Sequence, residues 1–100
     1  MKVLLSDKVR NRLAELWIAR ESDRLTLGEY QELLDWFELV TEQAIDFDSF
    51  GRQESKLLGL LSDRNTRRLI ELNLPRVAEV IATRDNETIT IISLEFFPAV

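Results

Sequence analysis

The spacing of the apolar residues changes near Val77, and this change restricts the fold more than any other feature of the chain. Before Val77, apolar residues recur at intervals of three and four, as they do along one face of an α-helix. After it, residues 77–83 and 88–94 are rich in β-branched side chains, which favour strands. The turn-forming sequence Arg84-Asp85-Asn86-Glu87 separates these runs and predicts a β-hairpin, with Asp85 and Asn86 as the two central residues of its turn.

Four helices are expected before the hairpin. Ser6 is suited to cap the first helix, and Thr26 and Glu29 have the spacing of a capping box at the start of the second. The four expected helices cover about residues 7–21, residues 27–45, a segment from a cap at Asp48 or Ser49 through Leu61, and a segment from Asn65 or Thr66 through about Leu72. Asn73 and Pro75 should end the last one.

An isolated two-stranded hairpin is only marginally stable in water. It must therefore pack on the helices, take up Lys2–Leu5 as a third strand, or pair with a second copy of the chain. A continuation of helix through residues 77–83 is the main alternative to the first strand. The expected fold is α+β, with about four helices followed by a C-terminal antiparallel β-hairpin and Lys2–Leu5 as a candidate N-terminal strand. With 100 residues, the chain should form a single globular domain over residues 1–100.

The composition argues against several kinds of chemistry. The chain has no Cys and no His, so thiolate nucleophiles, disulfides and imidazole general bases are excluded. Its three glycines are isolated and form no phosphate-binding loop. Asp23–Tyr30 resembles only the end of an EF-hand loop, because Ile18 and Arg20 would occupy the first two ligand positions. We therefore expect no enzymatic activity, no cofactor and no bound metal.

No apolar run is long enough for a signal sequence or a membrane span. The chain is therefore expected to be cytoplasmic and to make no contact with a membrane.

The charge is distributed unevenly. Residues 21–54 contain ten acidic and two basic side chains, whereas the other residues contain 8 acidic and 11 basic ones. The first segment is thus at −8 and the remainder at +3, which together give the net charge of −5. Such a separation indicates an acidic face that meets a basic partner.

The second expected helix supplies this acidic face. Leu33 and Phe37 belong to its apolar stripe, whereas Trp36 and Leu39 fall on the opposite, charged side. An apolar centre surrounded by carboxylates is typical of a protein-binding hot spot, although packing of the helix on both sides would explain the pattern equally well. The candidate partner-binding residues are Glu32, Asp35, Trp36, Leu39, Glu42 and Gln43.

A second pattern in the sequence suggests that the chain binds nucleic acid. Arg64, Arg67 and Arg68 lie at the start of the fourth expected helix, which follows another helix and precedes a hairpin. This order of elements over about residues 50–97 resembles a winged helix, in which the arginines would contact DNA. The net charge of −5 and the aliphatic hairpin argue against it.

The main hypothesis is therefore a small acidic, non-catalytic interaction module. It would act as an adaptor or inhibitor by binding the basic surface of a larger protein through the second helix. A homo-oligomer formed through the C-terminal hairpin is a further expected assembly. The alternative is a winged-helix-like DNA-binding transcriptional regulator.

Overall fold

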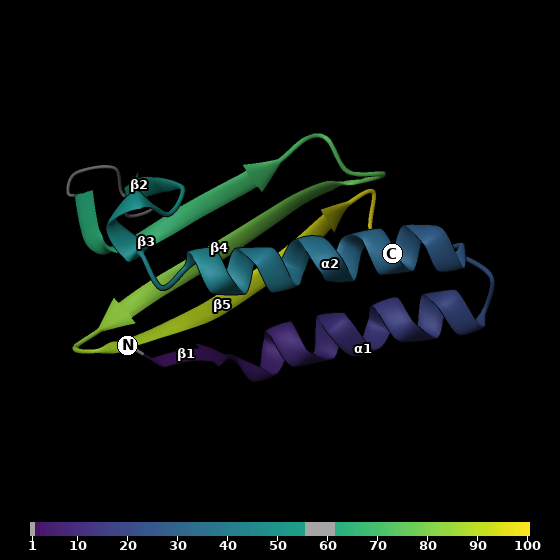
Figure 1. Cartoon of the computed structure of the whole chain (residues 1–100), viewed down its shortest axis with the longest axis horizontal. Helices are drawn as coiled ribbons and strands as arrows, with labels where there is room; N and C mark the ends of the chain where they lie inside the picture. The colour runs from purple at the N-terminus through teal and green to yellow at the C-terminus, as the bar shows by residue number, and fades with distance from the viewer. Residues whose placement is uncertain (1, 56–61) are drawn as a thin grey trace.

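The computed structural model describes residues 2–55 and 62–100. Its elements are β1 (Lys2–Leu5), α1 (Asp7–Glu21), α2 (Leu27–Gln43), a 3₁₀ turn (Phe47–Ser49), β2 (Arg52–Ser55), β3 (Ser62–Glu71), β4 (Val77–Asp85) and β5 (Thr88–Phe97). The strands form one sheet in the order β1-β5-β4-β3-β2, in which β1 is parallel to β5 and all other neighbours are antiparallel. Figure 1 shows α2 lying across the sheet and α1 lying beside α2, next to β5.

The first two helices begin where the sequence predicted. The Ser6 hydroxyl accepts a hydrogen bond from the Val9 amide at 3.3 Å, which caps α1. The same hydroxyl donates to the Ile92 carbonyl at 3.3 Å and thereby ties the start of α1 to β5. At the start of α2, both hydrogen bonds of the capping box between Thr26 and Glu29 are present. Both predicted caps are therefore confirmed.

The apolar core lies between the helices and one face of the sheet. Every second residue of β4 points toward the helices and is fully buried, namely Ala78, Val80 and Ala82. The helices contribute the buried side chains Val9, Leu16, Ala19, Leu33, Phe37 and Val40. A bulge opposite Ile81/Ala82 shifts the alternation along β5, so that Leu94 and Phe96 still face this core.

The predicted arrangement of four helices followed by a hairpin is wrong, and the described part of the third predicted helix contains no α-helix. The 3₁₀ turn and β2 occupy its first part, while Leu57–Leu61 lie outside the described residues. Gly51 accounts for the change of direction. It has a φ of +56°, and a Cβ placed on it would lie 2.3 Å from the carbonyl oxygen of Arg68. The chain thus passes close against β3 and continues as its neighbour β2.

The fourth predicted helix is also wrong, because β3 covers these residues. In the strand, Leu69 packs against the core and Ile70 faces the other side of the sheet. Pairing of residues 66–71 with residues 78–83 of β4 outweighs the weak helical preference of this segment.

The hairpin and the N-terminal strand are present. β4 and β5 pair along their length, and residues 2–5 pair with residues 88–91. The alternative helix over residues 77–83 is therefore excluded. The predicted turn is displaced by one residue, because Asp85 pairs with Thr88 and leaves Asn86 and Glu87 at the tip. Asn86 has a φ of 54°, a conformation that Asn tolerates better than most residues.

Candidate functional site

The predicted partner-binding residues all lie on α2, where they form one continuous surface. Leu39 is at its centre, because the helix places Asp35, Trp36, Glu42 and Gln43 three or four positions away. Glu32 lies one further turn along the same side. These six residues are called the α2 patch below.

Trp36 and Leu39 differ in their exposure. Leu39 is 50% exposed, whereas Trp36 is partly buried and packs against the core. Trp36 therefore faces inward and Leu39 faces outward on the same helix. The exposed apolar centre of the patch is Leu39.

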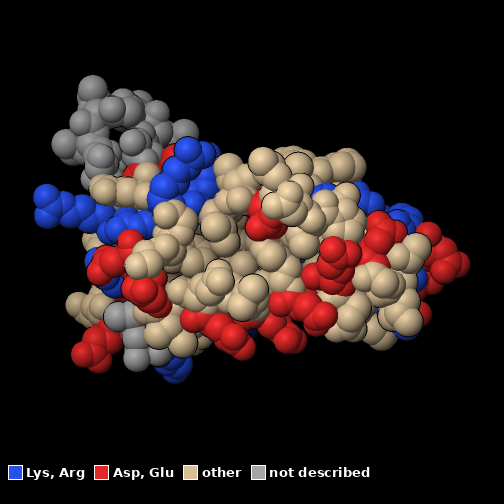
Figure 2. Space-filling model, turned by 45° about the horizontal axis from the view of Figure 1, so that its top comes forward, with Lys and Arg blue, Asp and Glu red and all other residues tan. Residues whose placement is uncertain are grey.

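The charge on α2 has no counterpart within the described chain. The helix carries five carboxylates (Glu29, Glu32, Asp35, Glu38 and Glu42) and no basic residue. Glu29 is used in the capping box, and the Asp35 carboxylate accepts a hydrogen bond from the Gln31 amide at 2.8 Å. None of the five forms an ion pair with another residue in 2–55 or 62–100. Figure 2 shows acidic side chains in a row along the lower side of the molecule.

A shallow apolar groove borders this acidic surface. It has a volume of about 440 Å³ and is lined by Leu5, Leu13, Leu34, Phe37, Glu38, Thr41 and Glu42. The apolar side chains come from β1, α1 and α2, and the two glutamates come from α2. The acidic side chains Asp35, Glu38 and Glu42 therefore lie between Leu39 on one side and the groove on the other.

Sequence reasoning missed this groove and did not assign Glu38 to the site. The groove exists only because β1, α1 and α2 pack together, and no local pattern reveals that arrangement. The available signal was the spacing of Leu34, Glu38 and Glu42, which places these three residues along one edge of the helix.

The three arginines of the alternative hypothesis lie on β3 and not on a recognition helix. Their side chains also separate, because Arg67 faces the helices and Arg68 faces the opposite side of the sheet. Arg68 lies between two carboxylates, with its Nε 3.1 Å from Glu54 and 3.6 Å from Glu79. The structure thus does not assemble Arg64, Arg67 and Arg68 into one basic surface.

Arg67 instead belongs to a cluster around Phe47. The guanidinium carbons of Arg67 and Arg84 lie 5.0 and 4.8 Å from the centre of the Phe47 ring. Asp48 lies 3.8 Å from Arg67 and 3.3 Å from Arg84. The Arg67 side chain is only 12% exposed, so its main contacts are internal. The cluster fastens the 3₁₀ turn to the sheet.

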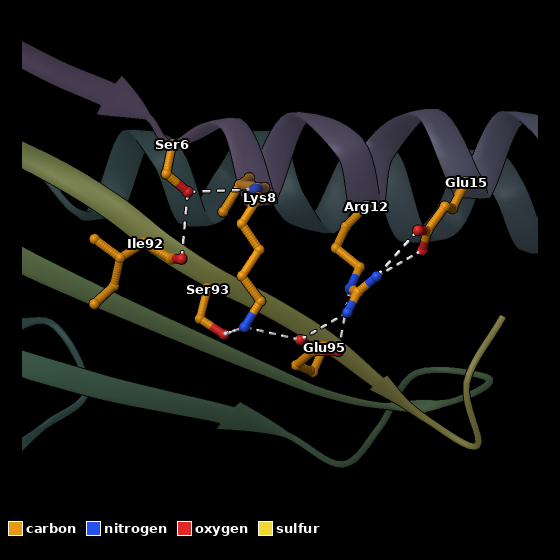
Figure 3. A network of polar contacts seen from close by, with 8 residues as sticks. Ser6, Lys8, Arg12, Glu15, Ile92, Ser93 and Glu95 are labelled. Atoms are coloured by element: carbon orange, nitrogen blue, oxygen red, sulfur yellow. Dashed lines mark hydrogen bonds and ion pairs between the residues drawn. The ribbon is translucent and has the colours of Figure 1, made fainter.

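A second network joins α1 to β5 (Figure 3). Glu95 forms ion pairs with Lys8 at 3.2 Å and with Arg12 at 3.2 Å, and Arg12 also pairs with Glu15 at 2.9 Å. Burial of Glu95 opposes its ionisation, but the hydrogen bonds and charges of Arg12 and Lys8 outweigh this effect and hold the pKa of Glu95 below its ordinary value. Glu95 also raises the pKa of Arg12. Glu95 therefore serves as an anionic anchor for α1.

The backbone edges of the hairpin are occupied. β3 pairs along β4, and β1 pairs with the first part of β5. Beyond that point, α1 packs against β5. The homo-oligomer expected through the hairpin stays a prediction.

Among residues 2–55 and 62–100, no three Asp or Glu side chains converge as metal ligands. No helix in the described part of the chain is long and apolar enough to cross a membrane.

Comparison with known proteins finds no matching family model, no matching curated protein and no matching solved structure.

Proposed function

We propose that this chain is a small cytoplasmic, non-catalytic interaction protein that binds a basic surface of a larger protein through the α2 patch. It would act there as an adaptor or as an inhibitor. The observation that carries this proposal is the isolated charge of α2, which has five carboxylates, no cation and no ion pair with another described residue.

Electrostatics supports a basic partner. Cationic side chains facing Asp35, Glu38 and Glu42 would accelerate and orient the encounter. The carboxylates elsewhere in the sheet, such as Glu54 and Glu95, are already neutralised by arginine or lysine. A basic surface would therefore be attracted to α2 in preference to the sheet.

Apolar contacts supply the affinity in such complexes. Leu39 offers one contact on the exposed side of the acidic residues, and the groove between Leu13 and Leu34 offers another. Trp36 supports the patch from beneath, since it packs against the core. The matching surface of the partner would carry Lys or Arg between two apolar side chains.

The DNA-binding alternative has less support. Its recognition helix is a strand, Arg67 is largely buried, and Arg68 is paired with two carboxylates. Duplex binding lost in the double variant Arg67→Ala/Arg68→Ala would revive it, provided that the variant remains folded.

The proposal is tested by capturing the tagged protein from a lysate of its native host, with a parallel sample treated with nuclease. A stoichiometric protein partner that survives nuclease is expected. The purified partner is then titrated with the wild-type chain and with Leu39→Asp. The variant should bind at least about thirtyfold more weakly, the equivalent of about 2 kcal/mol for a central contact.

Leu27→Asp is the matched control, because Leu27 is also exposed, at 62% against 50% for Leu39, but lies at the first position of α2. It should bind normally. Both variants should unfold within about 0.5 kcal/mol of wild type, since both positions are on the surface. Nuclease-sensitive recovery of DNA without a protein partner, or equal binding by wild type and Leu39→Asp, would contradict the proposal.

A further inference from the structure

The outer face of the sheet, which points away from α1 and α2, lacks a covering element in the described chain (Figure 1). The strand register places alternate residues of each central strand on this outer face. They include Thr66, Arg68 and Ile70 of β3, Val77, Glu79, Ile81 and Thr83 of β4, and Glu95 and Phe97 of β5. Leu4 of β1 lies on the same side, opposite Thr90.

Apolar side chains are exposed on this outer face. Ile70 is 39% exposed, Phe97 is 53% exposed, and Leu4 is 38% exposed. They come from three strands, so they are spread across the sheet and are not confined to one edge. An apolar surface of this kind favours contact with another protein surface.

The carboxylates on the outer face form ion pairs within the chain, and two further cations, Lys2 opposite Thr88 and Arg52 opposite Arg68, lie on the same side at the edges of the sheet. Arg68 pairs with Glu54 and Glu79, and Lys8 and Arg12 reach over from α1 to pair with Glu95 (Figure 3). Glu79 and Glu95 are direct cross-strand neighbours, so these cations also screen their mutual repulsion. Each of these three carboxylates thus has a cationic partner, in contrast to the unpaired carboxylates of α2.

We infer that the outer face binds a second copy of this chain and forms a face-to-face dimer. The carboxylates of this face are paired, so it carries none of the acidic excess that gives the chain its net charge of −5, and its two further cations, Lys2 and Arg52, lie on the two edge strands of the sheet. The acidic α2 helices would lie on the two opposite outsides of the dimer. A basic partner would instead be attracted to α2.

The size of the outer face agrees with a dimer. β4 and β5 have nine and ten residues, which at about 3.3 Å per residue gives a length of roughly 30 Å. Strands about 4.8 Å apart give a width of roughly 15–20 Å across the central part of the sheet. Two copies would therefore bury roughly 1,000 Å² or more, which reaches the lower limit for a specific interface.

The test is the molar mass of the purified full chain in solution, measured by sedimentation equilibrium over a concentration series. Wild type should approach twice the mass of one chain, and Ile70→Lys should remain at the mass of one chain. Leu39→Lys, which introduces the same charge on α2, should dimerise like wild type. Circular dichroism and thermal unfolding establish that each variant is folded.

Ile70→Thr is the second variant, because it keeps a β-branched side chain suited to a strand while removing apolar surface. It should weaken dimerisation at least tenfold even if Ile70→Lys fails to fold. A monomeric wild type at every concentration, or unchanged dimerisation of folded Ile70→Lys or Ile70→Thr, would overturn the inference. Because no basic partner is present, failure here leaves the proposed function of α2 unaffected.

Discussion

Glu95 lies on β5 at the contact between α1 and the sheet, and its lowered pKa makes the stability of the folded protein depend on pH. A carboxylate whose pKa is lowered in the folded state contributes stability above its unfolded pKa, which is about 4.3 for Glu. That contribution is lost as the pH falls through the lower pKa of the folded state. The ion pairs with Lys8 and Arg12 should therefore be fully effective at neutral pH and ineffective in strong acid.

Glu95→Gln should lower the free energy of unfolding by about 1 kcal/mol at neutral pH, since the pairs are partly exposed to solvent. The difference from wild type should shrink as the pH falls below about 4.3. Denaturant unfolding at a series of pH values measures it. Glu87→Gln, at the tip of the hairpin turn, is the control and should have little effect at any pH. A difference that stays constant with pH would show that Glu95 acts through packing and not through its charge.

Single residues also show what the sequence could and could not predict about the site. The position of Leu39 on the exposed side of α2 followed from helical periodicity, because α2 was placed correctly. The partial burial of Trp36 did not follow, since periodicity gives a direction around the helix but not the width of the surface that covers it. The groove beside Glu38 was not predictable, because three separate elements form it.

At the scale of elements, the helices are specified by residues within their own segments, whereas two of the strands depend on segments farther along the chain. α1 and α2 were predicted because their caps and periodicity are local. β2 and β3 were not, since neither segment has a strong strand preference of its own. β3 is extended because β4 lies beside it, and β2 is extended because Gly51 brings it against β3. The hairpin was predicted from its β-branched residues, but its register was not.

The start of α2 gives a prediction at this scale. Thr26→Ala removes the hydroxyl that accepts from the Glu29 amide at 3.0 Å and should lower the free energy of unfolding by about 1 kcal/mol. Thermal and denaturant unfolding measure the change. Thr41→Ala is the matched control, because the Thr41 hydroxyl only donates to the Phe37 carbonyl within the same helix. Equal effects of the two substitutions would indicate that the cap contributes no special stability.

For the whole molecule, the two proposed surfaces lie on opposite layers and differ in charge. The α2 layer is strongly acidic, whereas the outer face of the sheet exposes apolar side chains and its carboxylates are paired with cations. The two interactions should therefore be independent, so that one dimer presents two acidic helices to its surroundings.

Salt should affect the binding of the basic partner and the dimerisation differently. Raising the ionic strength from about 0.1 M to 1 M shortens the Debye length from about 10 to 3 Å and should weaken binding of the basic partner at least tenfold. The dimer should persist or tighten slightly, because apolar burial is not screened by salt. Partner titration and sedimentation under both conditions provide the measurement. Parallel loss of both complexes would show that the dimer also depends on charge.

The parallel pairing of β1 with β5 has a consequence for the order of folding. Lys2 lies beside Thr88, so the first strand has no partner until almost the whole chain has been synthesised. The hairpin between β4 and β5 closes through a two-residue turn and can form early, because little chain entropy is lost. β1 must then close a loop that contains both helices. Its docking is expected to be a late step, and it completes the sheet only after β5 is in place.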